Sequence, residues 1–373
     1  MSEDNLRVRQ AIEAFKAGEM IVVTDDDDRE NEGDLIVAAV HCTPEHMGFM
    51  VRHTSGIVCA PLSRQEAARL HLQPMVAHND APHSTAFTVS VDYRHDTTTG
   101  ISAAERCSTV RALANPNAGA SDFVRPGHIF PLVAKEGGVL TRSGHTEAAV
   151  DLCQLAELPP VGVISELVND DGSVKRGPDV AKFAAEHGLK SISVAELIAY
   201  RQRREKLVER VGERRIQTRF GEARAISYRT PFDPMQHLAL VFGNIHDGRP
   251  VPVRLHLEDV LGDVFGTNQA LQSGIASIAE GGRGVIVYLR EGAAGVTPDS
   301  EREPRGPTQS DDKAESHAST KIREDSWREI GLGAQILRDL DVSDIRLLAS
   351  RKRHYVGLSG FGITISETDI LDV

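Results

Sequence analysis

The amino-acid sequence predicts an α/β protein built from two domains, and three observations support this fold class. Short apolar runs rich in β-branched residues alternate with segments of helical periodicity, the pattern of strands alternating with helices. The chain has 373 residues, which is enough for two separate hydrophobic cores. The charged run RQRREK at residues 201–206 offers little apolar surface to either core. We therefore expect a first domain at residues 1–204 and a second at residues 205–373.

The first domain is expected to begin with a helix and to continue with strands. The helix carries Val8, Ile12 and Phe15 on one face and is expected to end at Gly18, a suitable C-cap. Apolar runs then predict strands, in order, at residues 20–23, 35–39, 56–62, the start of 86–106, and 162–168.

Helical patterns complete this domain. They are found, in order, at the end of residues 86–106, at the end of residues 125–158 and at residues 178–187. A last helix is introduced by the capping box formed by Ser193 and Glu196. Because no breaker follows, we expect this helix to continue as far as Val211.

The second domain repeats the α/β alternation from about Ile216 onward. Strands are expected at residues 237–243, 251–257, 284–289 and 345–349, and a helix at residues 333–340. Residues 291–320 are polar, rich in Pro and Gly and without periodicity, so we expect a flexible insertion there.

Composition narrows the classes of function. A formal charge of -12 argues against a general nucleic-acid binder, and no stretch approaches the roughly 20 apolar residues that cross a membrane. The N-terminus is acidic and amphipathic, unlike a secretion signal. The four cysteines, Cys42, Cys59, Cys107 and Cys153, form no CxxC pair and are expected to be reduced thiols of a cytoplasmic protein. A disulfide between them stays open.

An acidic loop is the strongest sign of function. Seven of the ten residues at 25–34 (DDDDRENEGD) are acidic, and apolar strands flank the loop on both sides. The carboxylates are therefore held close together, where their repulsion is costly without a cation. Arg29, placed among them, suits a site that also holds an anionic ligand, and Gly33 is expected to allow a tight backbone turn. The loop predicts a site for a divalent metal.

The acidic loop has two other interpretations. A solvated acidic turn is the common outcome for an acidic run. An EF-hand fails, because a loop that starts at Asp28 places Ala39 where a bidentate Glu is required. A start at Asp26 instead places Asn31 where Gly is required.

His145 is a second candidate, in the segment TRSGHTEAA at a loop-to-helix junction. A lone His is more often structural than a ligand. Here Arg142, Thr146 and the backbone amides of a helix N-terminus could hold a phosphate, while His145 faces the acidic loop. One imidazole with several carboxylates suits Mg²⁺ or Mn²⁺ better than Zn²⁺, which prefers more nitrogen or sulfur ligands.

Two further residues could move protons. His128 follows the turn Pro126-Gly127, which would expose its ring. Glu166 is the one charge in the apolar strand GVISELV, so it is either paired for structural reasons or raised in pKa for proton transfer. Together these clusters contain what a metal-dependent rearrangement of a sugar phosphate requires. The identity of the sugar stays open on these grounds.

The motifs DDxDRENEGDLI, RPGHxFPL, RxGHTEAAVDL and ELxNDDG, in this order, closely resemble those of the 3,4-dihydroxy-2-butanone-4-phosphate synthase family of riboflavin biosynthesis. The resemblance covers roughly residues 5–203. It implies a mixed-sheet α/β/α sandwich that converts ribulose 5-phosphate to 3,4-dihydroxy-2-butanone 4-phosphate and formate. It also implies Mg²⁺ as cofactor and a homodimer with active sites near the subunit interface.

The resemblance also implies roles for individual residues. Glu30 and His145 resemble the metal ligands, and His128 and Glu166 match positions needed for catalysis. Glu32 lies in the same motif and is a further candidate for proton transfer. The implied substrate-binding residues are Arg29, Glu30, Asp34, Arg142, Ser143, Gly144, His145, Thr146 and Glu166.

The second half, from about residue 205, resembles GTP cyclohydrolase II, whose family holds Zn²⁺ with three cysteines. Aligning the GDVFG core places Asp259, Ala270 and Gln272 at the ligand positions, and this half contains no cysteine. Near the retained Arg328, Ser326 and Ile330 replace the family's Asp and Tyr. We therefore expect a catalytically inactive α/β domain without zinc.

Alternatives for this half stay open. It could be an appendage kept for structure or assembly, or a module that senses a nucleotide or flavin or recruits another enzyme. A bifunctional chain with working GTP cyclohydrolase is disfavoured by the missing ligands.

Overall fold

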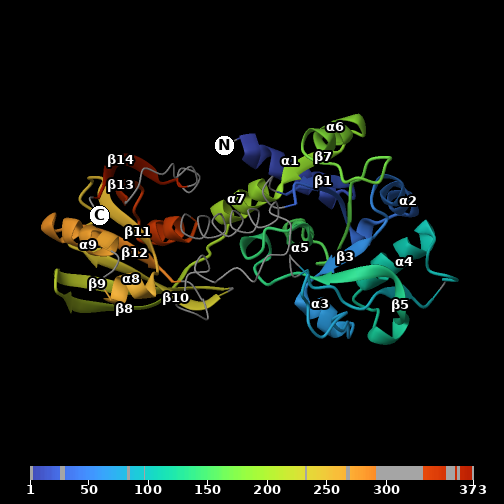
Figure 1. The fold of residues 1–373 in the computed structure, drawn as a ribbon, viewed down its shortest axis with the longest axis horizontal. Helices are drawn as coiled ribbons and strands as arrows, with labels where there is room; N and C mark the ends of the chain where they lie inside the picture. The colour runs from blue at the N-terminus through green and yellow to red at the C-terminus, as the bar shows by residue number, and fades with distance from the viewer. Residues whose placement is uncertain are drawn as a thin grey trace, which may run out of the picture. The chain divides into compact units, whose positions relative to one another are not determined.

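The computed structural model describes residues 3–25, 30–81, 85–95, 97–231, 233–265, 269–290, 331–349, 358 and 362–371. The chain divides into two compact units, Met1–Tyr200 and Arg201–Val373 (Figure 1). The expected insertion at 291–320 lies outside the described residues. No described helix has the length and apolar character needed to cross a membrane.

The first unit is organised around a mixed seven-stranded sheet. Its strand order is β4 (Val91–Tyr93), β5 (Phe123–Val133), β3 (Cys59–Leu62), β6 (Gly162–Glu166), β2 (Gly33–Ala38), β1 (Ile21–Thr24) and β7 (Lys190–Ser193). Strands β1 and β2 are antiparallel, as are β2 and β6, whereas β3 pairs with β5 and β1 with β7 in parallel.

Helices cover both faces of this sheet. They are α1 (Glu3–Lys16), α2 (Pro44–His53), α3 (Arg64–Arg69), α4 (Ala103–Leu113), α5 (His145–Leu155), α6 (Pro178–Glu186) and α7 (Val194–Arg204). Helix α5 packs on β1, β2, β3 and β6 and contacts α1. Apolar residues of α2, α4 and α6 share one core with alternate residues of β1 and β2, such as Val22 and Leu35. The expected mixed-sheet α/β/α sandwich is confirmed.

Local signals in the sequence explain several element ends. Gly18 has a φ of 96°, and its N–H bonds to the carbonyl of Phe15, so it ends α1 as predicted. The capping box of Ser193 and Glu196 is present in both directions, at 2.8 Å and 3.1 Å. A second capping box, formed by Ser102 and Glu105, begins α4.

The expected continuation of the last helix to Val211 is wrong, because α7 ends at Arg204. The buried Gln335 side chain donates to the carbonyl of Gln202 at 2.9 Å and accepts from the N–H of Leu207 at 2.7 Å. It therefore holds the chain in a non-helical path after α7. Leu207 is itself buried, so its apolar side chain favours this path as well.

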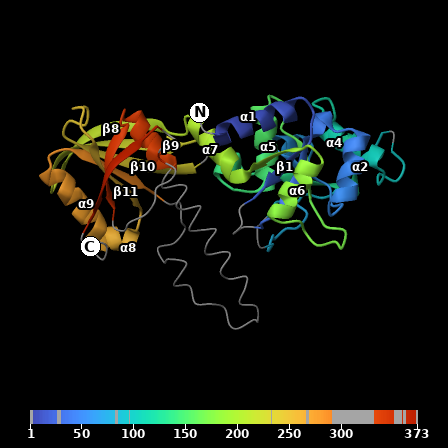
Figure 2. The same ribbon diagram turned by 90° about the horizontal axis from the view of Figure 1, so that it is seen from above.

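The second unit contains another seven-stranded sheet. The order is β14 (Thr364–Ile370), β13 (Asp344–Ala349), β11 (Val251–Leu257), β12 (Gly284–Leu289), β10 (Asp233–Phe242), β9 (Gly221–Thr230) and β8 (Glu209–Thr218). Helix α9 (Gln269–Glu280) packs on β11 and β12 and contacts the short helix α8 (Val260–Phe265) (Figure 2). A further helix occupies residues 331–339, close to the predicted span.

Candidate active site

The acidic loop connects two neighbouring antiparallel strands, because Thr24 at the end of β1 pairs with Gly33 at the start of β2. Asp25 organises the described part of this loop. Its carboxylate accepts hydrogen bonds from the backbone N–H groups of Glu30, at 3.1 Å, and Glu32, at 2.9 Å. The described residues of the loop are therefore folded back on a buried carboxylate, unlike a solvated acidic turn. Arg29 lies outside the described residues.

Gly33 serves a different purpose from the expected tight turn. It lies within β2, and its φ is not positive. A Cβ built at this position would lie 2.5 Å from Cγ1 of Val180 on α6. Gly33 is therefore needed because α6 approaches the start of β2 closely.

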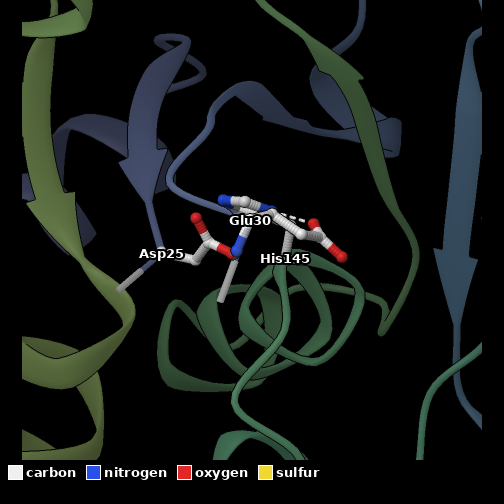
Figure 3. A group of neighbouring side chains, drawn as sticks. All are labelled: Asp25, Glu30 and His145. Atoms are coloured by element: carbon white, nitrogen blue, oxygen red, sulfur yellow. Dashed lines mark hydrogen bonds and ion pairs between the residues drawn. The ribbon is translucent and has the colours of Figure 1, made fainter. Parts of the chain in front are cut away.

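His145 is the first residue of α5 and faces the acidic loop, as predicted. Its buried ring places Nδ1 4.0 Å from Oε2 of Glu30 and 3.8 Å from Oδ1 of Asp34. Asp25, Glu30 and His145 each offer a ligand atom, and these atoms lie within 4.8 Å of one another (Figure 3). Of the described His, Cys, Asp and Glu side chains, these three form a group that is spaced to hold a metal ion.

The β2–β6 pairing brings Glu166 to the same place. Glu166 is the register partner of Asp34, and its Oε2 accepts a hydrogen bond from Ser55 Oγ at 2.6 Å. Four predicted residues therefore converge here: Glu30, Asp34, His145 and Glu166. Glu32 also lies near them, and Arg176 Nη2 approaches its carboxylate at 3.7 Å.

The crowded carboxylates have altered proton affinities. Burial, and then the charge of Glu166, raise the pKa of Asp34 well above its usual value. Burial also raises the pKa of Glu32, with further contributions from Glu30 and Asp25, whereas Arg176 lowers it. Asp34 Oδ1 is buried and accepts no hydrogen bond from any described residue. A cation would satisfy this oxygen and relieve the repulsion.

The segment from Arg142 to Thr146 leads into the N-terminus of α5, with Gly144 as N-cap. Thr146 is buried, and Ser143 is half-buried. Arg142 Nη1 pairs with the buried Glu147 at 2.6 Å, and Nη2 donates to Thr85 Oγ1 at 3.1 Å. The guanidinium is thus held in place beside the helix N-terminus, where an anion is favoured.

A single chain does not bring His128 to this cluster. Strands β3 and β6 lie between β5, which carries His128, and β2, so the backbones of His128 and Asp34 are about 14 Å apart. The His128 ring is turned towards β4, where Nδ1 bonds to Asp92 Oδ2 at 2.7 Å. The His128 side chain is 41% exposed, whereas that of Asp92 is 7% exposed.

Asp25 is a residue of the cluster to which the sequence pattern assigns no role of its own. A signal was available, because Asp25 directly follows the last residue of a buried strand. The N–H of Asp25 donates to the carbonyl of Glu32 at 3.3 Å, so Asp25 extends the pairing of β1 with β2. The sequence pattern alone does not distinguish it from Asp26, Asp27 and Asp28.

In the second unit, the positions aligned with zinc ligands have other contacts. Asp259 Oδ1 accepts a hydrogen bond from the N–H of Gly262 at 3.0 Å, at the start of α8. Gln272 Oε1 accepts from the guanidinium of Arg219. Ala270 belongs to α9, but its side chain lies outside the described residues.

A buried polar network lies next to these positions. His256 Nε2 is 2.9 Å from Asp263 Oδ1, and the Tyr288 hydroxyl donates to Asp263 Oδ2 at 2.7 Å. The rings of His256 and Tyr288 are stacked. Burial lowers the pKa of His256, which favours its neutral form. The network ties α8 to strands β11 and β12.

Family models match both halves of the chain. The model described as 3,4-dihydroxy-2-butanone 4-phosphate synthase matches residues 9–200. The chain belongs to this family. A second model, described as GTP cyclohydrolase II, matches residues 209–369. The predicted membership is therefore confirmed for a synthase with a GTP cyclohydrolase II-like second half.

Similar proteins extend over nearly the whole chain. "Riboflavin biosynthesis protein RibBA" of Bacillus mycoides is 45% identical over 367 residues, which cover 97% of this chain and 92% of the relative. "Bifunctional riboflavin biosynthesis protein RIBA 1, chloroplastic" of Arabidopsis thaliana is 47% identical, covering 96% of this chain and 67% of the relative. The predicted place of this synthase in riboflavin biosynthesis is confirmed.

Solved structures share the fold. RibBX from A. baumannii, described as a two-domain 3,4-dihydroxy-2-butanone 4-phosphate synthase, has a TM-score of 0.79 and 38% identity, covering 98% of this chain and 99% of that one. A 3,4-dihydroxy-2-butanone 4-phosphate synthase in complex with two magnesium ions has a TM-score of 0.52 and 49% identity, covering 53% of this chain and 97% of that one.

Proposed function

We propose that this synthase converts ribulose 5-phosphate to 3,4-dihydroxy-2-butanone 4-phosphate and formate, with Mg²⁺ or Mn²⁺ bound by Glu30 and His145. The observation that carries the proposal is the convergence of Asp25, Glu30 and His145, whose ligand atoms lie within 4.8 Å of one another. The magnesium-bound relative supports the choice of cation.

The residues of the cluster fit a hard divalent cation. They offer carboxylate oxygens and one imidazole, without a thiolate, which suits Mg²⁺ or Mn²⁺ rather than Zn²⁺. The buried Asp34 oxygen without a hydrogen-bond donor among the described residues supports the same conclusion. When bound, such a cation polarises neighbouring substrate oxygens and favours loss of a proton from the adjacent carbon.

Carboxylates of the chain are proposed to move the protons. Glu166 projects from the end of β6 at the cluster, and Ser55 fixes one of its oxygens. Glu32 has a raised pKa, so it can hold a proton near neutral pH more readily than an ordinary Glu. We assign proton transfer to Glu166 and Glu32. Asp34 and Arg29 are proposed to orient the sugar hydroxyls and the anion.

The phosphate of the substrate is proposed to lie at the N-terminus of α5. The backbone from Arg142 to Thr146 supplies N–H groups and hydroxyls there, and Arg142 supplies a fixed positive charge. His145 in the same segment joins this anion site to the metal site. The spacing of the motif thus sets the distance between phosphate and metal.

We further propose a homodimer in which His128 of one subunit completes the site of the other. His128 is half-exposed, turned away from its own cluster and buttressed by the buried Asp92. A rigid, half-exposed imidazole on β5, next to the edge strand β4, suits a role across an interface. The cytoplasm is the proposed compartment, consistent with four free cysteines.

Complementation tests this arrangement. His128→Asn and Glu30→Gln chains are each expected to be inactive as homodimers. When they are unfolded and refolded together, a mixed dimer has one site with an intact cluster and an intact His128. Random mixing should restore about a quarter of wild-type formate release, because half of the dimers are mixed and each has one working site. No recovery in a mixture that contains mixed dimers by mass would contradict the shared site.

For the second half, we propose that no GTP hydrolysis takes place. Asp259 and Gln272 are engaged in other hydrogen bonds, and this half contains no cysteine. The two-domain RibBX supports a synthase with a second domain of another role. The alternative is a bifunctional chain, as in the name of the Arabidopsis thaliana relative. A nucleotide-sensing or partner-binding role is also compatible with the retained fold.

A further inference from the structure

Two of the four cysteines lie side by side, away from the metal cluster. Cys42 follows the short helix η1 (Ala39–His41) beyond the end of β2 opposite to the acidic loop, and Cys107 lies in α4. The Cys107 thiol lies 3.2 Å from the carbonyl oxygen of Cys42. The two thiols are also hydrogen-bond partners of each other. Residues distant in sequence thus place two thiols next to each other.

The two sulfurs of this pair are not equivalent. Hydrogen bonding to Cys107, followed by burial, raises the pKa of Cys42. The same hydrogen bond, received from Cys42, lowers the pKa of Cys107, and the charge of Arg111 one turn later in α4 acts in the same direction. Cys107 is therefore the sulfur that carries negative charge when the pair loses a proton.

A cavity gives small molecules access to Cys107. Its volume is about 570 Å³, it is open to solvent, and its walls include Cys107, Arg111, Tyr93 and Ser108. This volume is many times the roughly 30 Å³ share of one water molecule, so hydrogen peroxide fits easily. Arg111 is an exposed residue of the cavity lining, and its charge favours an anionic sulfur at Cys107.

The other two cysteines provide internal controls. Cys59 lies in β3, where burial raises its thiol pKa. Burial also raises the pKa of Cys153 to about 12, and its thiol lies 3.4 Å from the carbonyl oxygen of Val161. Neither residue lines the cavity. Both are expected to stay thiols under conditions that oxidise Cys107.

We propose that Cys42 and Cys107 form a redox-active dithiol, with Cys107 as the sulfur attacked from the cavity by a peroxide and Cys42 as the resolving thiol. The Cys107 thiolate attacks one oxygen of hydrogen peroxide, the O–O bond breaks, and a sulfenic acid and hydroxide result. The Cys42 sulfur, losing its proton, then attacks the Cys107 sulfur and expels hydroxide. In total, two thiols and one peroxide give one disulfide and two waters.

The test uses the full-length wild-type chain in its folded state. The reduced protein is treated with hydrogen peroxide and quenched with catalase, and the remaining thiols are then alkylated after denaturation. Peptide mass spectrometry should find two of the four thiols lost, in one peptide pair that joins Cys42 to Cys107 and separates on treatment with dithiothreitol. Oxidation at Cys59 or Cys153 first, or four free thiols after a dose that oxidises a model thiol peptide, would overturn the proposal.

Matched variants separate the two roles. In Cys42→Ser, Cys107 should stop at the sulfenic acid and react with dimedone. In Cys107→Ser, Cys42 should stay reduced, because the sulfur that faces the cavity is gone. Cys59→Ser and Cys153→Ser should form the disulfide as wild type does. Dimedone labelling of Cys42 instead of Cys107 would reverse the assigned order and contradict the proposal.

Discussion

At the scale of single residues, the charge balance of the acidic loop governs both stability and function. Burial of Asp34, and then repulsion from Glu166 and Glu30, raise its pKa. A protein optimised for stability alone would replace such a residue, so its presence indicates that a cation or substrate is meant to offset the cost.

The first prediction concerns pH. The folded chain holds the protons of Asp34 and Glu32 more tightly than the unfolded chain does, because folding raises both pKa values. The two groups therefore contribute their full stabilisation at low pH. This contribution is lost as the pH rises above about 4 and passes through the raised pKa values. In the absence of metal, the free energy of unfolding of Asp34→Asn should therefore match that of wild type near pH 4. Near pH 8 it should exceed that of wild type by on the order of 1 kcal/mol. Thermal melts in EDTA measure this. A variant that parallels wild type at every pH would refute the assignment.

The second prediction concerns Glu166. If Glu166 transfers a proton, Glu166→Gln should lower kcat by at least about 10²-fold, the usual size of such a contribution, and change KM far less. Glu157→Gln, an exposed position on the same unit, is the matched control and should leave both constants near wild type. A raised KM with normal kcat in Glu166→Gln would show that the residue only holds substrate.

At the scale of elements, α6 positions the start of β2 and with it Asp34. Gly33 allows this contact, since a Cβ there would lie 2.5 Å from a methyl carbon of Val180. The start of β2, which carries Asp34, is thus fixed by the close packing of Gly33 against the buried Val180 of α6.

The third prediction follows from this contact. Gly33→Ala should destabilise the fold by about 1–3 kcal/mol through overpacking. Adding Val180→Ala should lessen the clash, so that the double variant is more stable than the sum of the two single changes predicts. Gly48→Ala in α2, where a Cβ meets nothing within 4 Å, is the control and should be neutral or slightly stabilising. Chemical denaturation measures all four, and additive effects would contradict the contact.

Buried strands were predictable from the sequence, because they are short apolar runs rich in β-branched residues, a composition that turns and amphipathic helices lack. The runs at 35–39 and 284–289 correspond to β2 and β12. The hairpin of β8 and β9 was not predicted. Most residues of β8 are exposed, and its alternating Arg and Glu side chains resemble the polar face of a helix. Its pairing with β9, a tertiary contact, decides its conformation.

The part of the site whose residues lie in the recognised sequence motifs was predictable. Glu30, Asp34 and His145 meet as expected because a short loop and a helix start hold them. The role of Asp25 depends on the path of the loop backbone, which the run of four aspartates does not reveal. The distance of His128 from this cluster follows from strand order, a property of the whole sheet.

At the scale of the whole molecule, the two units each contain a seven-stranded sheet but differ in the functional residues that they retain. The first contains the group of Asp25, Glu30 and His145 spaced to hold a metal ion, whereas the second retains a core and the His256–Asp263 network without the aligned thiolates. Such a network stabilises the fold of the second unit without needing a zinc ion.

The fourth prediction is that the purified full-length chain contains no stoichiometric zinc and releases no formate from GTP. A single carboxylate at Asp259 cannot replace three thiolates. The assay is best made with Glu30→Gln, in which the first unit is expected to release no formate. Elemental analysis near one zinc per chain, together with GTP-dependent formate from this variant, would make the protein bifunctional.

The central claim is that a divalent cation bound at Glu30 and His145 drives the synthase reaction, and formate release from ribulose 5-phosphate tests it most directly. EDTA should abolish release by wild type, and excess Mg²⁺ or Mn²⁺ should restore it. Glu30→Gln and His145→Ala should stay inactive under both conditions, whereas the exposed controls Glu19→Gln and His246→Ala should behave as wild type. Formate release near the wild-type rate in EDTA, or in either cluster variant, would contradict the claim.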